Sequence, residues 1–134
     1  MNNSVKKNDR SKIIFPKLSY KIVGVLFEVY NHLGPGFQEK HYQRAIVREL
    51  KKEKMPFKEQ VYSPLIYKEE NIGSQFIDFL IDNKIILEIK KGDRFSKNNI
   101  DQILNYLKTK KLKLGIIANF GSKELKFKRI INFD

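Results

Sequence analysis

The apolar run "LKLGIIANF" at residues 112–120 constrains the fold more than any other part of the chain. A strand with one face in solvent alternates apolar and polar residues. A nearly continuous apolar run is instead typical of a strand inside a sheet with both faces covered. The rest of the chain must therefore supply neighbouring strands and the elements that cover them.

Helical periodicity appears before any strand. Apolar residues recur at spacings of three and four over residues 18–33, and "GPG" ends this pattern. A second helix is predicted from about residue 37 to residue 54, with an apolar stripe along one side. A third is predicted over about 98–110, where Ser96 or Asn98 is a candidate N-terminal cap. Two helices thus precede the sheet.

The segment between the second and third helices has the pattern of strands. "FKEQVY" alternates, Pro64 interrupts it, and "LIYKE" resumes the strand pattern. "SQFIDFLI" and "KIILEIKK" flank "DNK" in the manner of a hairpin, so three or four antiparallel strands are predicted here. With a last strand near "LKFKRIINF", we expect one α/β or α+β domain over residues 18–134 with a mixed central sheet. Residues 1–17 are polar and aperiodic, which predicts a flexible basic arm.

The formal net charge of +12 is large for 134 residues and favours a polyanionic partner, nucleic acid before membrane lipid. The arm carries +4 of this charge, so the predicted domain is basic by itself. Solubility and a lysine-rich proteome are the alternative explanation for charge alone. Charge does not separate a protein that binds nucleic acid from one that cuts it.

The chain has no cysteine, which excludes a disulfide framework and a thiolate zinc site and suits a reducing cytoplasm. Two histidines are too few for a histidine-based metal cage. No run approaches the roughly 18 consecutive apolar residues of a membrane span, and "IIF" is too short for the core of a signal peptide. We therefore expect a soluble, cytoplasmic protein.

Charged residues interrupt the apolar strand "IILEIKK" at Glu88 and Lys90. Side chains alternate along a strand, so these two project from one face while Leu87 and Ile89 project from the other. The chain has three further acid-x-lysine triplets, but they lie on a helix, in a turn and at a loop end, where charges are solvated. The strand setting therefore distinguishes this triplet from the others.

The preceding strand supplies a second carboxylate, Asp78. If the turn is the three residues "DNK", residue 81 pairs with residue 85 and Asp78 falls opposite Glu88; a two-residue turn would place them on opposite faces. Two carboxylates this close require a proton or a cation between them, and oxygen ligands suit Mg²⁺ or Mn²⁺. The alternative is an exposed sheet face on which Lys90 neutralises Glu88.

Three residues on the predicted helices are further candidates. Glu39 lies on the inward stripe of the second helix, although a carboxylate in a first helical turn is also favoured by the helix dipole. Gln102 and Tyr106 lie one turn apart on the third helix, beside its apolar stripe, where both could point at a ligand. Pairs of this kind are common on helices without any function.

The order of these motifs resembles the GxxExxY protein family, a branch of the PD-(D/E)XK nuclease superfamily. The match covers about residues 20–132 and consists of five short motifs in order: Gly36, Glu39 and Tyr42 as G-x-x-E-x-x-Y, "ID" at 77–78, "LEIKK" at 87–91, "QILNYL" at 102–107 and "LGIIANFG" at 114–121.

The resemblance implies a restriction-endonuclease-like core with an acidic site on the central hairpin. Asp78 and Glu88 match the metal-binding acids, Lys90 the lysine of the signature, and Glu39 the helical glutamate. Gln102 and Tyr106 match the Q-x-x-x-Y motif of phage-exonuclease-type relatives. The superfamily's usual proline before the aspartate is replaced by Ile77, and the last strand is short.

We therefore expect a nuclease that hydrolyses phosphodiester bonds with one or two Mg²⁺ ions, or Mn²⁺. DNA is favoured over RNA as the substrate, although the sequence does not decide between them. The expected metal ligands are Asp78, Glu88, the Ile89 carbonyl and Glu39, with Lys90 orienting the nucleophile or stabilising the oxyanion. Gln102 and Tyr106 would hold the phosphate or a metal-bound water.

Two other functions stay open. The main alternative is a catalytically silent nucleic-acid-binding module with the same fold, and the second is a basic interaction protein whose acids form only structural salt bridges. A homodimer is one possibility for a small enzyme that cuts duplex. The sequence alone distinguishes neither single from double strands nor end-directed from internal cleavage.

Overall fold

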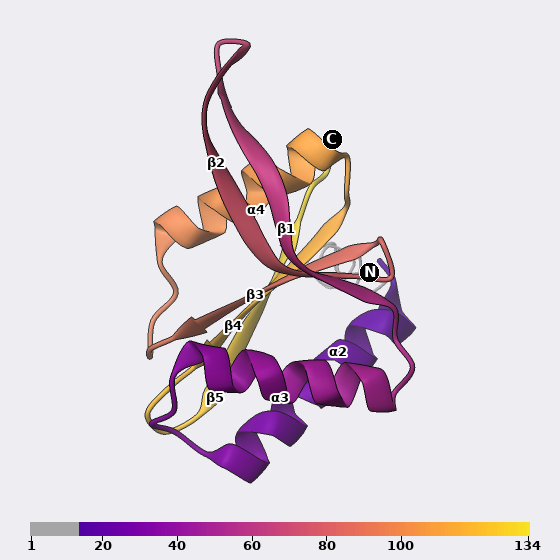
Figure 1. Ribbon diagram of the computed structural model, residues 1–134, viewed down its shortest axis with the longest axis vertical. Helices are drawn as coiled ribbons and strands as arrows, with labels where there is room; N and C mark the ends of the chain where they lie inside the picture. The colour runs from indigo at the N-terminus through magenta and orange to yellow at the C-terminus, as the bar shows by residue number, and fades with distance from the viewer. Residues whose placement is uncertain (1–13) are drawn as a thin grey trace, which may run out of the picture.

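The computed structural model describes residues 14–134, so the predicted arm at residues 1–17 lies mostly outside the described residues. Within residues 14–134 two helices come first, followed by a sheet whose strands are interrupted in the sequence by one further helix (Figure 1). In chain order the elements are α2 (Pro16–Leu33), α3 (Glu39–Lys52), β1 (Phe57–Tyr67), β2 (Glu70–Ile81), β3 (Ile85–Lys91), α4 (Lys97–Lys110), β4 (Leu114–Phe120) and β5 (Leu125–Ile131).

The five strands form one mixed sheet in the order β1-β2-β3-β4-β5. Neighbouring strands are antiparallel except β3 and β4, which are parallel and are joined by the crossover helix α4. All seven residues of β4 are buried, which confirms that "LKLGIIANF" contains a strand covered on both faces. The predicted mixed sheet, with two helices before it, is therefore confirmed.

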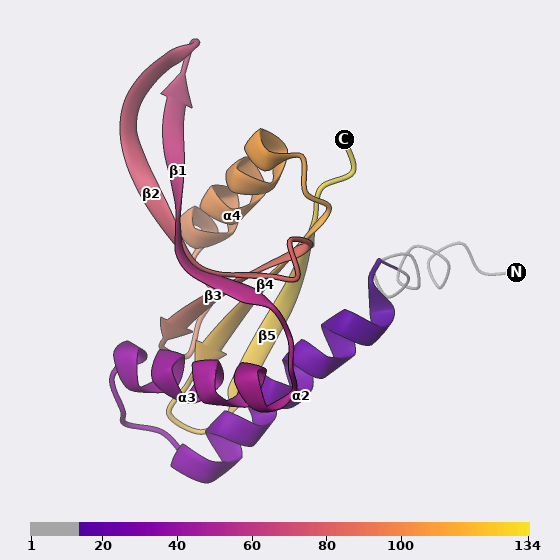
Figure 2. The same cartoon turned by 45° about the vertical axis from the view of Figure 1, so that its right-hand side comes forward.

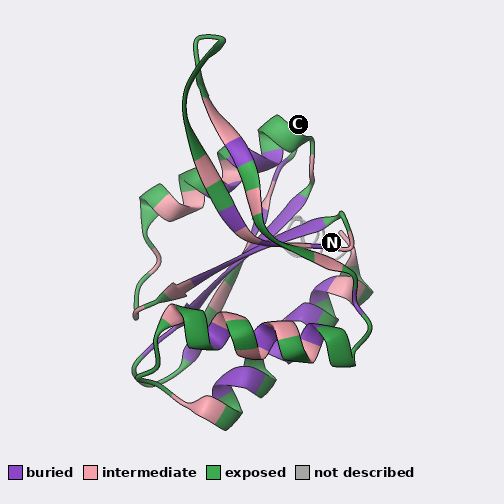
Figure 3. Cartoon of the chain, in the orientation of Figure 1, coloured by how far each residue is buried: buried purple, intermediate pink, exposed green. Residues whose placement is uncertain are grey.

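The sheet divides the core into two layers, because helices cover both of its faces, as the turned view in Figure 2 shows. Helices α2 and α3 cover one face, where Ile22, Ile46, Leu87 and Ile116 belong to one buried cluster. Helix α4 covers the opposite face, and its buried residues cluster with strand residues that include Ile86 and Ile117. Figure 3 shows the purple, buried segments concentrated along the centre of the sheet and the helix sides that face it.

Strands β1 and β2 form a long hairpin that extends past the rest of the sheet and curves over α4 (Figures 1 and 2). The prediction that Pro64 interrupts the strand was wrong, because β1 continues through it and Pro64 pairs with Ser74. Proline is tolerated there because β1 is an edge strand, where a missing N–H need not break a ladder.

The helix ends differ slightly from the sequence prediction. Helix α2 begins at Pro16, two residues earlier than expected, and proline suits the first turn because its missing N–H would have no helical partner. Helix α3 is shorter than predicted at both ends. Helix α4 is capped by Ser96, whose Oγ accepts the backbone N–H of Asn99 at 3.3 Å. No helix within residues 14–134 is long and apolar enough to cross a membrane.

Candidate active site

The candidate site lies where β2 separates from β3. The turn between them has Asp82 and Asn83 in the left-handed conformation, and Ile81 pairs with Ile85, so the predicted three-residue turn is confirmed. Only three residue pairs join the two strands, ending at Phe79 and Leu87. Beyond this point β3 continues alongside β4 to Lys91, and its edge toward β2 has no strand partner.

Asp78 and Glu88 lie where the two strands separate. The side chain of each accepts a hydrogen bond from a backbone N–H of the other strand. The N–H of Asp78 donates to Glu88 Oε1 at 3.0 Å, and the N–H of Ile89 donates to Asp78 Oδ2 at 2.8 Å. Each carboxylate therefore takes a bond that a regular ladder would give to a backbone carbonyl.

Glu39 reaches the same edge of β3 from the first turn of α3. Its Oε2 accepts the N–H of Lys91 at 3.1 Å. The N–H and C=O of one strand residue point to the same side, so the Ile89 carbonyl lies on this edge, between the bonds to Asp78 and Glu39. Three of the four predicted metal ligands, Asp78, the Ile89 carbonyl and Glu39, thus lie along one short stretch of β3. The fourth, Glu88, is connected to them by its hydrogen bond from the N–H of Asp78.

The G-x-x-E-x-x-Y motif has a local structural explanation. The hydroxyl of Tyr42 donates to the Gly34 carbonyl at 2.6 Å and lies 3.4 Å from the N–H of Phe37, which donates to it. The Tyr42 ring stacks on Phe120 of β4 with 4.2 Å between the ring centroids. The tyrosine thereby ties the loop before α3 to the sheet, and the loop fixes where Glu39 begins the helix.

The electrostatics of the acid pair are unusual for a protein surface. Burial, followed by the nearby charge of Asp78, raises the pKa of Glu88 to about 8, while the positive charge of Lys90 acts in the opposite direction. Without a cation the folded protein therefore holds a proton on Glu88 at neutral pH. This is the behaviour expected of two carboxylates that share a site.

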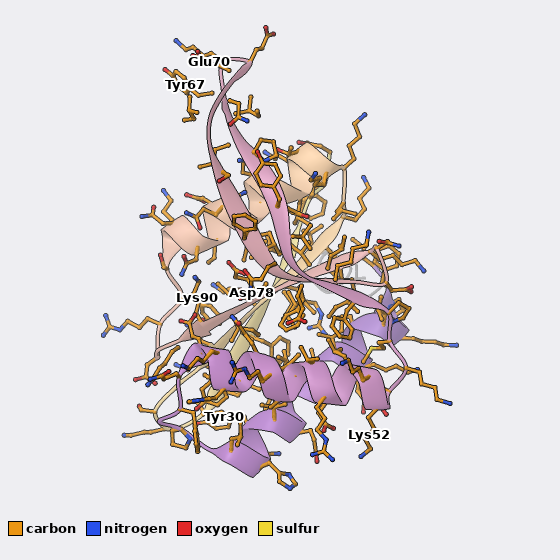
Figure 4. All side chains as sticks on the ribbon, in the orientation of Figure 1. Tyr30, Lys52, Tyr67, Glu70, Asp78 and Lys90 are labelled. Carbon is orange, nitrogen blue, oxygen red and sulfur yellow. The ribbon has the colours of Figure 1, made fainter. Side chains whose placement is uncertain are left out.

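Lys90 lies beside the acids without neutralising them. In Figure 4 its side chain and Asp78 lie next to each other between α3 and α4. The alternative in which Lys90 neutralises Glu88 requires a direct ion pair, but within residues 14–134 no salt bridge joins them. Lys90 is half-buried.

The two candidates on α4 are placed differently from one another. Gln102 is exposed, as expected. Tyr106 does not lie beside the apolar stripe as predicted; it is 1 % exposed and packs within the cluster that contains Ile77 and Ile86. Burial raises the pKa of its hydroxyl. Neither residue forms a hydrogen bond with the acids in the described part of the chain.

The sequence interpretation missed two residues next to the site. Gln60, with a φ of 49°, donates from Nε2 to Asp78 Oδ1 at 3.4 Å. Asn119 lies beside Lys90 in the parallel pair β3–β4; its Nδ2 donates to the Arg94 carbonyl at 2.6 Å, while its buried Oδ1 has no partner. Asn119 carried the same signal as Glu88, a polar residue inside an apolar strand. No sequence signal marked Gln60.

The donor set fits a hard divalent cation that keeps several waters. No group of three or more acidic, histidine or cysteine side chains within residues 14–134 is close enough to hold a metal by itself. Asp78 and Glu88 with the Ile89 carbonyl supply only oxygen donors, which Mg²⁺ and Mn²⁺ prefer, and Mg²⁺ commonly binds one or two carboxylates and completes its shell with water. Glu39 must either release Lys91 or act through such a water.

The fold and the acid pair define a nuclease-like domain. A family model described as the PD-(D/E)XK nuclease superfamily matches residues 16–130, and the chain belongs to this superfamily. The crystal structure of a protein named SSO0001 is similar at 15% sequence identity, with a TM-score of 0.48, over 86% of this chain and 77% of that chain. A likeness of this size says nothing about activity. No curated protein matches the chain.

Proposed function

We propose that this protein is a divalent-metal-dependent nuclease that hydrolyses phosphodiester bonds, acting on DNA in preference to RNA. The observation that carries the proposal is the exchange of bonds between Asp78 and Glu88, which leaves one buried carboxyl with a pKa of about 8 beside a free strand edge. Two neighbouring carboxyls that hold a proton at neutral pH beside an unpaired strand edge can exchange that proton for a divalent cation, which supports the proposed site. The order of the sequence motifs supports membership of the GxxExxY branch as part of this proposal.

The residues have distinct proposed roles. Asp78, Glu88 and the Ile89 carbonyl would hold the cation, with Glu39 directly or through water. A bound divalent cation supplies a water of lowered pKa and screens the charge that develops on the phosphate. Lys90 would orient the attacking water or stabilise the developing oxyanion. Gln102, exposed on α4, would hold the phosphate or a water, whereas the buried Tyr106 would only pack α4 against the sheet.

Basic residues next to the site suit a phosphate backbone. The segment 90–97, which follows β3's acid Glu88, contains four basic residues and one acid, Asp93; the basic residues are Lys90, Lys91, Arg94 and Lys97. The carboxylate of Asp93 is engaged by the N–H and hydroxyl of Ser122, which lowers its pKa. Phosphates bound by such residues would make binding salt-dependent.

A cleavage assay on DNA and RNA, single- and double-stranded, with Mg²⁺, Mn²⁺ or chelator tests the proposal. Glu88→Gln should abolish metal-dependent cleavage and leave the fold intact, because the amide oxygen can still accept the N–H of Asp78. Glu124→Gln is the matched control, because Glu124 is an exposed acid in another acid-x-lysine triplet and should leave cleavage unchanged. Equal cleavage by the Glu88→Gln and unsubstituted proteins would overturn the proposal. DNA binding without metal-dependent products would instead identify a silent binding module.

A further inference from the structure

The outer face of the β1–β2 hairpin carries an exposed aromatic pair. Tyr62 and Phe76 are cross-strand partners, with ring centroids 5.8 Å apart and an interplanar angle of 65°. Their exposed fractions are 48% and 54%. The neighbouring residues Val61 and Ile77 pack on the opposite side, in the cluster under α4. The hairpin therefore packs one face against the domain and presents the aromatic face to solvent.

This pair lies next to the candidate active site. Phe76 precedes Asp78 by two residues on β2, and Tyr62 follows Gln60 by two residues on β1. Gln60 donates to Asp78, so both strands lead from the aromatic pair to the same carboxylate. At about 3.3 Å per strand residue, the pair lies roughly 7 Å along the hairpin from the acid, which is close to the spacing of one extended nucleotide.

Charge is distributed unevenly around the acids. The hairpin at residues 57–81 has two lysines and four acids, although the whole chain carries +12. The cations near the site lie on its other side, in residues 90–97 after β3. Phosphates are thus attracted to the far side of the acids, while the hairpin, with a net charge of −2, offers an aromatic pair for bases and no cluster of cations for phosphates.

We propose that Tyr62 and Phe76 form a stacking platform for unpaired bases of single-stranded DNA whose backbone enters the site at Asp78 and Glu88. The choice of DNA as the ligand rests on the proposed function. Aromatic side chains stack on the faces of bases, and in a duplex these faces are covered by neighbouring base pairs. A platform beside the acids therefore selects single strands, or single-stranded segments next to a duplex.

A tryptophan reporter tests the contact directly. The chain has no tryptophan, so Phe76→Trp introduces a single indole fluorophore at the platform. Oligothymidine titrated in chelator, where no cleavage takes place, should quench its fluorescence, and a duplex of the same length should not. Tyr20→Trp is the matched control, because Tyr20 is 78% exposed on α2 and should show no quenching. Absence of quenching by oligothymidine in the Phe76→Trp variant, or equal quenching by the duplex, overturns the proposal.

Affinity measurements give an independent test. Tyr62→Ala and Phe76→Ala should each weaken oligothymidine binding about ten-fold, and binding of the duplex should change less than about two-fold, because stacking energy is lost only with unpaired bases. Phe76→Tyr should restore the binding that Phe76→Ala loses. If the alanine variants instead convert a dimer into a monomer and bind oligothymidine normally, the face is an interface between two copies and the proposal is wrong.

The two proposals fail in different ways. Binding and quenching are measured in chelator and need no catalysis, so they can succeed when cleavage fails, which would remove the proposed nuclease activity and keep the platform. Cleavage that requires Glu88 but is equally fast on duplex and single strands, and unaffected by Phe76→Ala, keeps the nuclease and removes the platform.

Discussion

Asp78 on β2 and Glu88 on β3 lie opposite each other, and the side chain of Glu88 bonds the backbone of Asp78. The N–H of Asp78 donates to Glu88 Oε1 at 3.0 Å, and Asp78 in turn accepts the N–H of Ile89 at 2.8 Å. Each acid thus satisfies a backbone group of a strand that has lost its ladder partner. The carboxylates are therefore part of the fold as well as candidate ligands, and substitutions must preserve an acceptor if function is to be separated from stability.

The stability of the metal-free protein should fall as the pH rises. Burial and Asp78 raise the pKa of Glu88 from its ordinary 4.5 to about 8, so the folded protein keeps a proton that the unfolded chain has released. The unfolded state binds fewer protons over this interval, and the free energy of unfolding must decrease from about pH 5 to about pH 8 and then become level. Urea denaturation in chelator at constant ionic strength measures this slope.

Glu88→Gln is the control for this slope, because the amide oxygen can still accept the N–H of Asp78 but cannot titrate. The difference in unfolding free energy between the two proteins should depend on pH only between about pH 4.5 and about pH 8. Saturating Mn²⁺ should reduce the dependence in the unsubstituted protein, since the cation replaces the proton. Parallel pH profiles for the two proteins would mean that Glu88 is ionised throughout.

The acid pair could be predicted from the sequence because it depends only on the alternation of side chains along two adjacent strands and on the length of the turn between them. Strand alternation placed Glu88 and Lys90 on one face, and the turn length decided that Asp78 falls opposite Glu88, which the pairing of Ile81 with Ile85 confirms. The separation of the strands beyond this point was not predictable. It depends on Gln60, whose left-handed backbone has no signature in the residue type, and on side-chain bonds that form only after folding.

Two other features depended on tertiary position. Pro64 would end a central strand, but β1 is at the sheet edge, and periodicity does not indicate which strand is the edge. Tyr106 is buried because the contact of α4 with the sheet is wider than the stripe of aliphatic residues, so an aromatic side chain at its border is covered as well. The partnerless Oδ1 of Asn119 could be found only from coordinates.

Gly115→Ala should destabilise the protein by about 1–3 kcal/mol, the usual cost of overpacking. A Cβ on Gly115 would lie 2.8 Å from Cγ2 of Ile103 and 2.9 Å from Cγ1 of Ile86, so α4 must move away from the sheet. Gly24→Ala is the matched control, because nothing lies within 4 Å of its Cβ position and alanine in a helix should add about 0.5–1 kcal/mol. Urea denaturation measures both, and a neutral Gly115→Ala would mean that α4 is packed loosely.

Glu39→Gln should weaken Mn²⁺ binding about 10- to 100-fold if Glu39 supports the proposed metal site through a water. The amide oxygen can still accept the N–H of Lys91, so the first turn of α3 should keep its position. Calorimetric titration measures the affinity. Glu53→Gln, which changes an exposed acid just beyond the other end of α3, is the control and should leave it unchanged. Equal affinities for Glu39→Gln and the unsubstituted protein would limit Glu39 to a structural role.

Tyr42→Phe should lower the free energy of unfolding by about 0.5–1.5 kcal/mol, because the Gly34 carbonyl loses its hydrogen-bond donor while the stack on Phe120 remains. Tyr30→Phe is a closely matched control: the hydroxyl of this buried tyrosine donates to the Gly121 carbonyl at 2.8 Å. Both variants should lose similar stability in urea denaturation, since each loses one hydroxyl-to-carbonyl bond and the additional bond from the Phe37 N–H to the Tyr42 hydroxyl is long, at 3.4 Å.

The two tyrosine variants should differ in metal binding. Only the Tyr42 hydroxyl holds the loop that positions Glu39 at the start of α3, so only Tyr42→Phe should weaken Mn²⁺ binding, and by no more than Glu39→Gln does. The double variant of Tyr42 and Glu39 should then bind Mn²⁺ no more weakly than Glu39→Gln alone, because the tyrosine acts through the glutamate. Additive losses in the double variant would show that Tyr42 supports the site by another route.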